Sequence, residues 1–220
     1  MVVDRFMLCR ATLPALAMLL LAACHSPYAA LRPAPGMTPG QVLALRPQFA
    51  SRMYKTEVDV VGKHLSGLLL LKTMPDSSKR VVFTSETGPT LFDFSFGKDG
   101  AFEVKYCLKA LRRKAVLRTL RQDFELLLLE NPGQAGPAVL RDSSQLYFPF
   151  RNGKSTNYFR TDPAAQHLLG MEKAGRRKQK VRIDIPPTRA GLPDSVWIEH
   201  RNFTFAIRMK TLERVKPDDE

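Results

Sequence analysis

Residues 90–108 read TLFDFSFGKDGAFEVKYCL, and this stretch indicates the fold class of the chain. Phe92, Phe94 and Phe96 alternate with polar residues, which is the period of two expected of a strand with one buried face. The Asp99-Gly100 pair that follows is a strong signal for a tight hairpin turn. The stretch therefore predicts two antiparallel strands that share an apolar face.

The second half of the stretch repeats the alternation. Phe102, Val104, Tyr106 and Leu108 are expected on the apolar face. Cys107 then falls on the opposite, polar face, where a small and weakly polar residue is tolerated.

Strand patterns of the same kind occur along most of the chain. They cover residues 53–61, 64–74, 79–84, 146–150, 154–160, 180–185, 196–200 and 202–212. Residues 109–130 instead carry apolar residues three to four apart, which predicts a helix, and Asn131-Pro132-Gly133 ends it. We therefore predict a mainly β fold, an antiparallel meander that forms a half-barrel or open barrel with one long amphipathic helix.

The N-terminus has the pattern of an export signal. Residues 1–23 combine two arginines with an apolar run that is too short to span a bilayer, which needs about 20 residues. The sequence Leu21-Ala22-Ala23-Cys24 resembles the lipobox of bacterial lipoprotein precursors. This resemblance implies that residues 1–23 are removed and that Cys24 is acylated. The alternative is an ordinary signal peptide whose cleavage site adjoins a cysteine.

The residue after Cys24 bears on the compartment. It is His25 rather than aspartate, and in the enterobacterial lipoproteins that the motif resembles, an aspartate there retains the protein in the inner membrane. We therefore expect a protein of the cell envelope that is lipid-anchored in the outer membrane and faces the periplasm.

Composition divides the rest of the chain into three parts. Residues 24–51 hold five prolines and no packing pattern, so we expect the lipidated cysteine and a tether. Residues 52–214 form the expected β-rich domain, and residues 215–220 form an acidic tail. With Cys24 acylated, Cys107 has no partner in the mature chain, and no intramolecular disulfide is expected.

The positive charge is concentrated in two segments. The formal net charge is +13, and residues 109–121 and 173–182 together contain twelve basic residues and no acidic one. A basic face on a helix, or a basic loop, is suited to anionic lipid headgroups or an acidic partner. A solvated helix face and a solubilising loop are the alternatives. The candidate contacts are Lys114, Arg118 and Arg121 on the helix and Arg176, Arg177 and Lys178 in the loop.

The sequence contains no motif of an enzyme or of a metal site. The four histidines lack metal-ligand spacing, and neither a nucleophile elbow nor a glycine-rich phosphate loop is present. We expect no catalytic, cofactor or metal site, although an active site assembled from distant residues stays open. His200 is expected to be a structural residue on a strand. Nucleic acid is not an expected partner, because the protein has an export signal and lacks the corresponding motifs.

The order of these elements resembles the LolA/LolB-like superfamily of lipoprotein carriers. A lipobox is followed by a Pro-rich tether, many antiparallel strands and one amphipathic helix. The resemblance implies an unclosed barrel with a helical lid over a hydrophobic cavity that accepts acyl chains. Our candidate cavity residues are Phe92, Phe94, Phe96, Phe203 and Phe205. The alternative is that these residues fill an ordinary closed core.

Two functions stay open at this point. The first is an outer-membrane-anchored lipoprotein whose half-barrel binds acyl chains of lipids or lipoproteins in envelope transport. The second is a structural or assembly lipoprotein of the envelope that docks an acidic partner or anionic lipid through its basic residues. A cavity of roughly several hundred Å³ favours the first function, and a filled core with a flat basic face favours the second.

Overall fold

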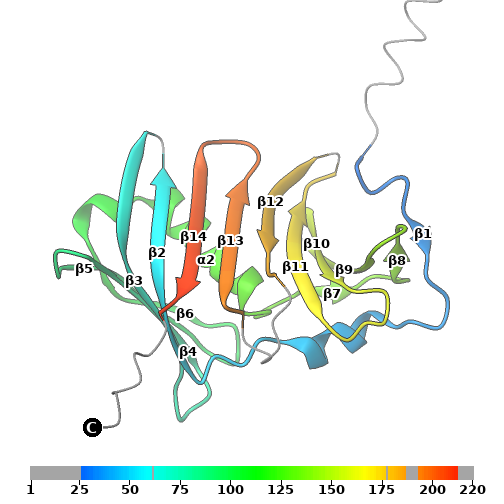
Figure 1. Cartoon of the computed structure of the whole chain (residues 1–220), viewed down its shortest axis with the longest axis horizontal. Coiled ribbons are helices and arrows are strands. Elements are labelled where there is room, and N and C mark those ends of the chain that lie inside the picture. The colour runs from blue at the N-terminus through cyan, green and yellow to red at the C-terminus, as the bar shows by residue number, and fades with distance from the viewer. Residues whose placement is uncertain (1–25, 61, 177, 187–192, 213–220) are drawn as a thin grey trace, which may run out of the picture.

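The computed structural model describes residues 26–60, 62–176, 178–186 and 193–212 (Figure 1). The expected signal peptide (1–23), the lipidation site at Cys24 and the acidic tail (215–220) lie outside these residues.

Fourteen strands form one antiparallel sheet. Their order is β1-β8-β9-β10-β11-β12-β13-β14-β2-β3-β4-β5-β6, and β7 pairs with β9. Because β1 and β6 are the two ends of this order, the described sheet is open rather than closed into a barrel. The prediction of a mainly β, open antiparallel meander with one long helix is confirmed. The strands are β1 (Arg32–Pro33), β2 (Ser51–Val60), β3 (Lys63–Thr73), β4 (Lys79–Ser85), β5 (Thr90–Phe96), β6 (Phe102–Cys107), β7 (Gln134–Ala135), β8 (Leu140–Arg141), β9 (Leu146–Asn152), β10 (Ser155–Thr161), β11 (Leu168–Ala174), β12 (Gln179–Asp184), β13 (Ser195–His200) and β14 (Phe205–Thr211).

The pairing register separates the sheet into an apolar and a polar face. Directly opposed residues on neighbouring strands form one buried apolar row across β9 to β2. Each such side chain contributes about 1.5–3 kcal/mol relative to an exposed position. On the opposite face, Glu172, Arg182 and Glu199 are cross-strand neighbours. The apolar row consists of Phe148, Phe159, Met171, Ile183, Ile198, Ile207 and Val58.

The long helix covers the apolar face. It is α2 (Lys114–Leu127), preceded by the short 3₁₀ turn η3 (Lys109–Leu111), and it lies behind β2, β14 and β13 in Figure 1. Its side chains Leu120, Phe124 and Leu127 are buried. The chain then passes through Asn131 and Gly133, whose φ angles of 48° and 102° place them in left-handed backbone that cannot continue a helix.

A β-bulge changes which residues of β6 point inward. Phe94 pairs with Val104 but Asp93 pairs with Tyr106, so Lys105 is the extra residue on β6. Beyond this point the alternation is reversed. Tyr106 is 43% exposed and Cys107 is buried, so the expectation that Tyr106 and Leu108 face the core and Cys107 the polar side is wrong. Burial also raises the pKa of the Cys107 thiol, which makes it less reactive.

The N-terminal segment differs from the tether that we expected over residues 24–51. Its described part packs onto the sheet, and the turn η2 (Pro39–Leu45) buries Val42. Phe49 is likewise fully buried, and Ala34 donates its backbone N–H to the Val139 carbonyl oxygen. Single apolar residues without a regular period are enough to dock this segment, which is why periodicity did not reveal the contact.

Tyr28 fixes the beginning of the described chain. Its ring stacks on Tyr158 at a centroid distance of 4.0 Å, and its hydroxyl donates a hydrogen bond of 2.6 Å to Glu172 Oε2. Burial and the neighbouring Glu172 carboxylate raise the pKa of Tyr28, so the phenol stays a donor at neutral pH. The residues before β1 are thereby attached to β10 and β11.

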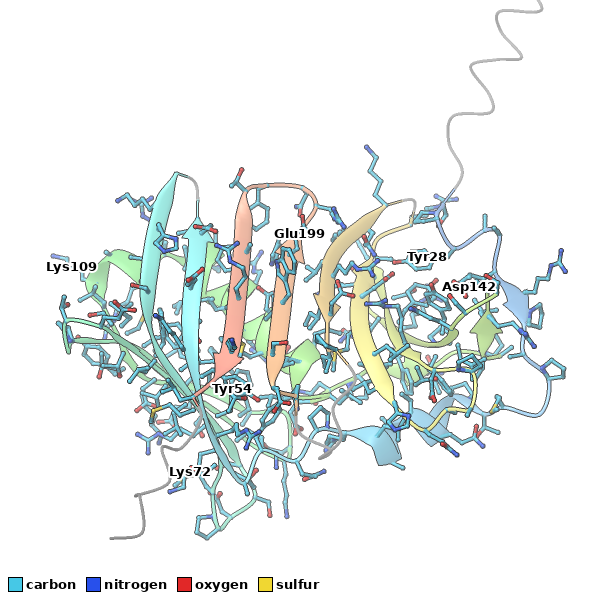
Figure 2. The ribbon with its side chains drawn as sticks, viewed as in Figure 1. Tyr28, Tyr54, Lys72, Lys109, Asp142 and Glu199 are labelled. Atoms are coloured by element: carbon cyan, nitrogen blue, oxygen red, sulfur yellow. The ribbon has the colours of Figure 1, made fainter. Side chains whose placement is uncertain are left out.

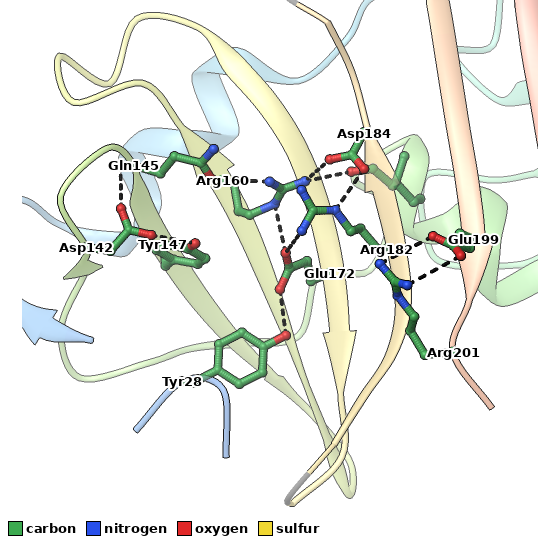
Figure 3. A network of polar contacts seen from close by, with 11 residues as sticks. Tyr28, Asp142, Gln145, Tyr147, Arg160, Glu172, Arg182, Asp184, Glu199 and Arg201 are labelled. Atoms are coloured by element: carbon green, nitrogen blue, oxygen red, sulfur yellow. Dashed lines mark hydrogen bonds and ion pairs between the residues drawn. The ribbon is translucent and has the colours of Figure 1, made fainter. Parts of the chain in front are cut away.

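Glu172 belongs to a buried charged network on the polar face (Figure 3). Arg160, whose side chain is 2% exposed, places its Nε 3.1 Å from Glu172 Oε1 and donates from Nη1 to Gln145 and from Nη2 to Asp184. Gly170 makes room for this guanidinium, because a Cβ there would lie 2.5 Å from Arg160 Nη2 and 2.1 Å from a backbone oxygen. Two buried charges in such a network are tolerated only while each keeps its partners.

Tyr28→Phe tests whether the N-terminal segment is part of the fold. Losing the hydroxyl leaves the buried Glu172 carboxylate with one donor fewer, and we expect the free energy of unfolding to fall by about 1–3 kcal/mol. Urea denaturation of residues 26–212 measures it. The matched control is Tyr106→Phe, at an exposed tyrosine, which should change stability by less than about 0.5 kcal/mol. If Tyr28→Phe and Tyr106→Phe change the free energy of unfolding equally, the N-terminal segment is a tether that does not contribute to the fold.

The contacts of Asp184 predict how the stability of the protein changes with pH. Burial would raise its pKa, but hydrogen bonds from Arg182 and Arg160 outweigh burial and hold the pKa below its usual value of 3.8. The carboxylate therefore contributes stability that is present above pH 3.8 and lost as the pH falls through the lower, folded-state pKa. Asp184→Asn should lower the urea midpoint at about pH 6. Between about pH 6 and pH 3, the variant should lose less stability than the unchanged protein. Parallel pH curves would contradict this assignment.

Candidate functional site

An apolar cavity of about 80 Å³ lies between α2 and the sheet. Among its lining side chains are Val58, Leu69, Phe92, Val116, Leu120 and Phe205. They come from β2, β3, β5, α2 and β14, so strands from both halves of the chain enclose the cavity. It is smaller than the several hundred Å³ that we set as the mark of an open carrier.

The structure places the five candidate phenylalanines in three different environments. Phe92 and Phe205 line the cavity. Phe94 and Phe96 pack in the core against Phe102, at centroid distances of 5.3 and 5.2 Å. Phe203 is 42% exposed, because β14 begins only at Phe205 and residues 201–204 form the turn that precedes it. The structure therefore does not support Phe203 as a cavity residue.

A buried polar contact between Asp123 and His200 attaches α2 to the sheet. Asp123 Oδ2 lies 2.9 Å from His200 Nε2, and the two side chains are only 2% and 6% exposed. The rings of Phe203 and Phe205 pack on the imidazole at 4.6 and 5.0 Å. Burial raises the pKa of Asp123, whereas the hydrogen bond to His200 opposes that rise. The sequence places His200 on a strand but does not reveal this partner, which lies 77 residues away.

A second polar contact lies beside this pair. Lys173 Nζ on β11 donates to Gln122 Oε1 on α2 at 2.9 Å. Burial lowers the pKa of Lys173, and the nearby Asp123 charge opposes the shift. Together with the buried residues Leu126–Leu129, these contacts fix the C-terminal half of α2.

The N-terminal half of α2 is held less firmly. Its N-cap residue Arg113 makes no side-chain capping hydrogen bond, and the first turn contains no acidic residue. The basic residues Arg112, Arg113 and Lys114 instead lie at the positive end of the helix dipole, which is unfavourable. This is the half that carries Val116 over the cavity. The helix thus has a strongly fixed end and a weakly stabilised end.

The basic candidate residues are only partly available. Lys114 and Arg118 on α2 are exposed, as are Arg176 and Lys178 between β11 and β12. Arg121 is instead paired with Glu125 at 2.7 Å, with its guanidinium carbon 5.0 Å from the Phe102 ring centroid. Arg121 therefore does not join an open basic face. Arg177 lies outside the described residues.

The described residues show no other constellation typical of chemistry. No group of three or more histidine, cysteine, aspartate or glutamate side chains among them is arranged to hold a metal ion. None of the described helices combines the length and the hydropathy that crossing a bilayer requires.

Comparisons with known proteins add little detail. No family model matches the chain, and no curated protein matches it. Among solved structures, a DUF1329 family protein from Desulfovibrio piger is similar with a TM-score of 0.45 and 6% identity, over 80% of this chain and 90% of that one. A domain from Vibrio parahaemolyticus, named for a proposed role in outer membrane lipoprotein sorting, is similar with a TM-score of 0.45 and 8% identity, over 83% of this chain and 94% of that one.

A double-mutant cycle tests the Asp123–His200 pair. Asp123→Leu leaves a buried imidazole without its partner and should cost about 1–3 kcal/mol of unfolding free energy. Changing both residues to leucine should recover more than half of that loss, because an apolar pair needs no partner charge. Urea denaturation of the two single variants and the double variant gives the coupling. Additive losses would show that the two residues do not interact.

Proposed function

We propose that the protein binds a lipid acyl chain in the interior between α2 and the apolar face of the sheet. The observation that carries this proposal is an apolar cavity under the weakly stabilised N-terminal half of α2, which covers the sheet. The ligand is the acyl chain of a lipid or of a lipoprotein in transit. The role is therefore carriage or reception of lipid in the cell envelope.

The cavity is too small for an acyl chain, so binding in this proposal requires that α2 moves. A volume of about 80 Å³ is well below the roughly 300–1,000 Å³ of pockets that hold organic ligands. Displacing the N-terminal half of α2 exposes Val116, Leu117 and Leu120, at about 1.5–3 kcal/mol each. A chain of about fourteen carbons contributes roughly 10 kcal/mol when buried, at about 0.8 kcal/mol per methylene. An acyl chain of ordinary length can therefore replace the helix contacts that it displaces.

We propose the membrane attachment on the sequence alone. Its support is the lipobox-like sequence that ends at Cys24, followed by His25. In this proposal Cys24 carries the acyl anchor and the protein works at the periplasmic face of the outer membrane.

Native mass spectrometry of residues 26–212 tests the proposal. We expect co-purified lipid and uptake of a fluorescent fatty acid from solution. Val116→Phe narrows the space beneath α2 and should weaken fatty acid binding by at least about tenfold. Leu68→Phe is the matched control at an exposed position on β3 and should leave the affinity unchanged.

The same measurement separates the proposal from its alternative. An absence of co-purified lipid together with no uptake of fatty acid would overturn the carrier function. That outcome supports an assembly lipoprotein with a closed core, a function favoured by the small volume of the cavity.

A further inference from the structure

The pairing register brings several hairpin turns to one end of the sheet. Val60 pairs with Lys63, Asn152 with Ser155, and Ala174 with Thr156 on the neighbouring strand. Figure 1 shows the β2–β3, β11–β12 and β13–β14 hairpins together at the top of the molecule. We call this end the hairpin rim. Its described residues are Gly62, Lys63, Asn152, Gly153, Lys154, Gly175, Arg176, Lys178 and Arg201–Thr204.

The two ends of the sheet differ in charge. Exposed basic residues gather at the hairpin rim, and the charge of Arg201 there is offset by Glu199 at 3.3 Å. The segments at the opposite end carry aspartates, which lie between β3 and β4, between β5 and β6, between β10 and β11 and just before β13. The basic residues of the rim are Lys63, Lys154, Arg176 and Lys178, with Lys180 beside them at the start of β12, and the aspartates are Asp76, Asp99, Asp162 and Asp194. Lys72, Lys98 and Lys210 also lie towards the opposite end, so it carries both signs of charge, whereas the residues named for the hairpin rim include no acid.

The described chain begins beside the basic end. Tyr28 is held by Tyr158 and Glu172, which lie two to three residues from the rim ends of β10 and β11. Figure 2 shows Tyr28 and Glu199 in the upper half of the molecule and Lys72 at its lower end. Cys24 is four residues before Tyr28, a separation that spans at most about 14 Å. An acyl anchor on Cys24 would therefore hold this end, rather than the opposite end, near the bilayer.

We propose that the hairpin rim docks on the anionic surface of the membrane. The orientation of the protein in this inference rests on the proposed acylation of Cys24. The choice of an anionic surface rests on its charge complementarity to the basic residues of the rim. Lysine and arginine side chains are attracted to anionic headgroups within about 10 Å of the surface. Phe203 is 42% exposed at the rim, and an aromatic ring is suited to the headgroup region.

The rim also lies next to the cavity. Val60 and Phe205, which line the cavity, are paired at the rim ends of β2 and β14. A docked rim therefore places the apolar interior against the bilayer from which an acyl chain would come. Binding at the headgroup surface and binding in the interior involve different side chains and can be measured separately.

Vesicle binding by residues 26–212 tests the docking. Every buried residue of the core lies between Ala34 and Met209, and this chain lacks Cys24, so no acyl anchor contributes. We expect binding to phosphatidylcholine vesicles that contain about 30% phosphatidylglycerol, and loss of binding as salt is raised. The triple variant Lys154→Glu/Arg176→Glu/Lys178→Glu should reduce the partition coefficient at least about tenfold.

The control changes the net charge equally at other sites. Lys72, Lys98 and Lys210 are exposed and lie towards the opposite end, and their change to glutamate should keep binding within about twofold. Equal losses for the two triple variants would show an effect of net charge alone and overturn the docking site. Equal binding to vesicles without phosphatidylglycerol would overturn the choice of an anionic partner. Circular dichroism confirms that each variant is folded.

A fluorophore reports the direction of docking. Attached at Phe203→Cys in a Cys107→Ala background, it should be quenched by brominated lipid, whereas the same label at Lys98→Cys should not. Quenching at both sites, or only at residue 98, contradicts the orientation. If vesicles bind as expected while fatty acid is not taken up, the docking surface stands and the acyl-chain proposal fails.

Discussion

The pairing of β14 with β2 is the contact on which the rest of the structure depends. It joins Phe205 to Val60 and Thr211 to Tyr54, and thereby connects the strands β2–β6 with the strands β8–β14. Without it, each half-sheet would expose an apolar face that α2 is too narrow to cover. With it, the apolar rows of the two halves become continuous, and α2 lies across the join. On one side, Asp123 contacts His200 of β13. On the other side, the ring centroids of Phe124 and Phe92 of β5 lie 5.9 Å apart.

This placement explains why the two ends of α2 differ. The C-terminal half has its polar and apolar partners on β11 and β13 and runs into the buried residues Leu126–Leu129. The N-terminal half has basic residues at an uncapped end, where the helix dipole repels them. The helix is therefore most readily displaced where it covers the apolar cavity. That asymmetry, rather than the present cavity volume, is the physical basis of the acyl-chain proposal.

The polar face and the hairpin rim indicate which end of the molecule lies near the expected lipid anchor. The part-buried hydrogen bond between Tyr28 and Glu172 attaches the N-terminal segment to β10 and β11, so Cys24, the expected anchor point, lies four residues before this contact. The same strands lead to the basic hairpin between β11 and β12. The proposed membrane attachment and the proposed electrostatic attraction would therefore act on the same end of the molecule, beside Val60 and Phe205 of the apolar cavity.

The sequence by itself determined the local features. Alternation and turn signals predicted an open β meander, one helix near residues 109–130 and apolar positions such as Phe92 and Phe205. These features depend on neighbours within a few residues, which periodicity detects. The same rule failed after the bulge at Lys105, where one added residue exchanges the two faces.

Only the tertiary structure decided which distant residues meet. Tyr28 and Glu172 are separated by 144 residues, and Asp123 and His200 by 77, and no local pattern encodes such pairs. Strand register likewise brought Lys154 to the same rim as Arg176 and Lys178. The physical reason is that register depends on cooperative burial across the whole sheet, whereas sequence periodicity records only the preference of each strand for one of its own faces.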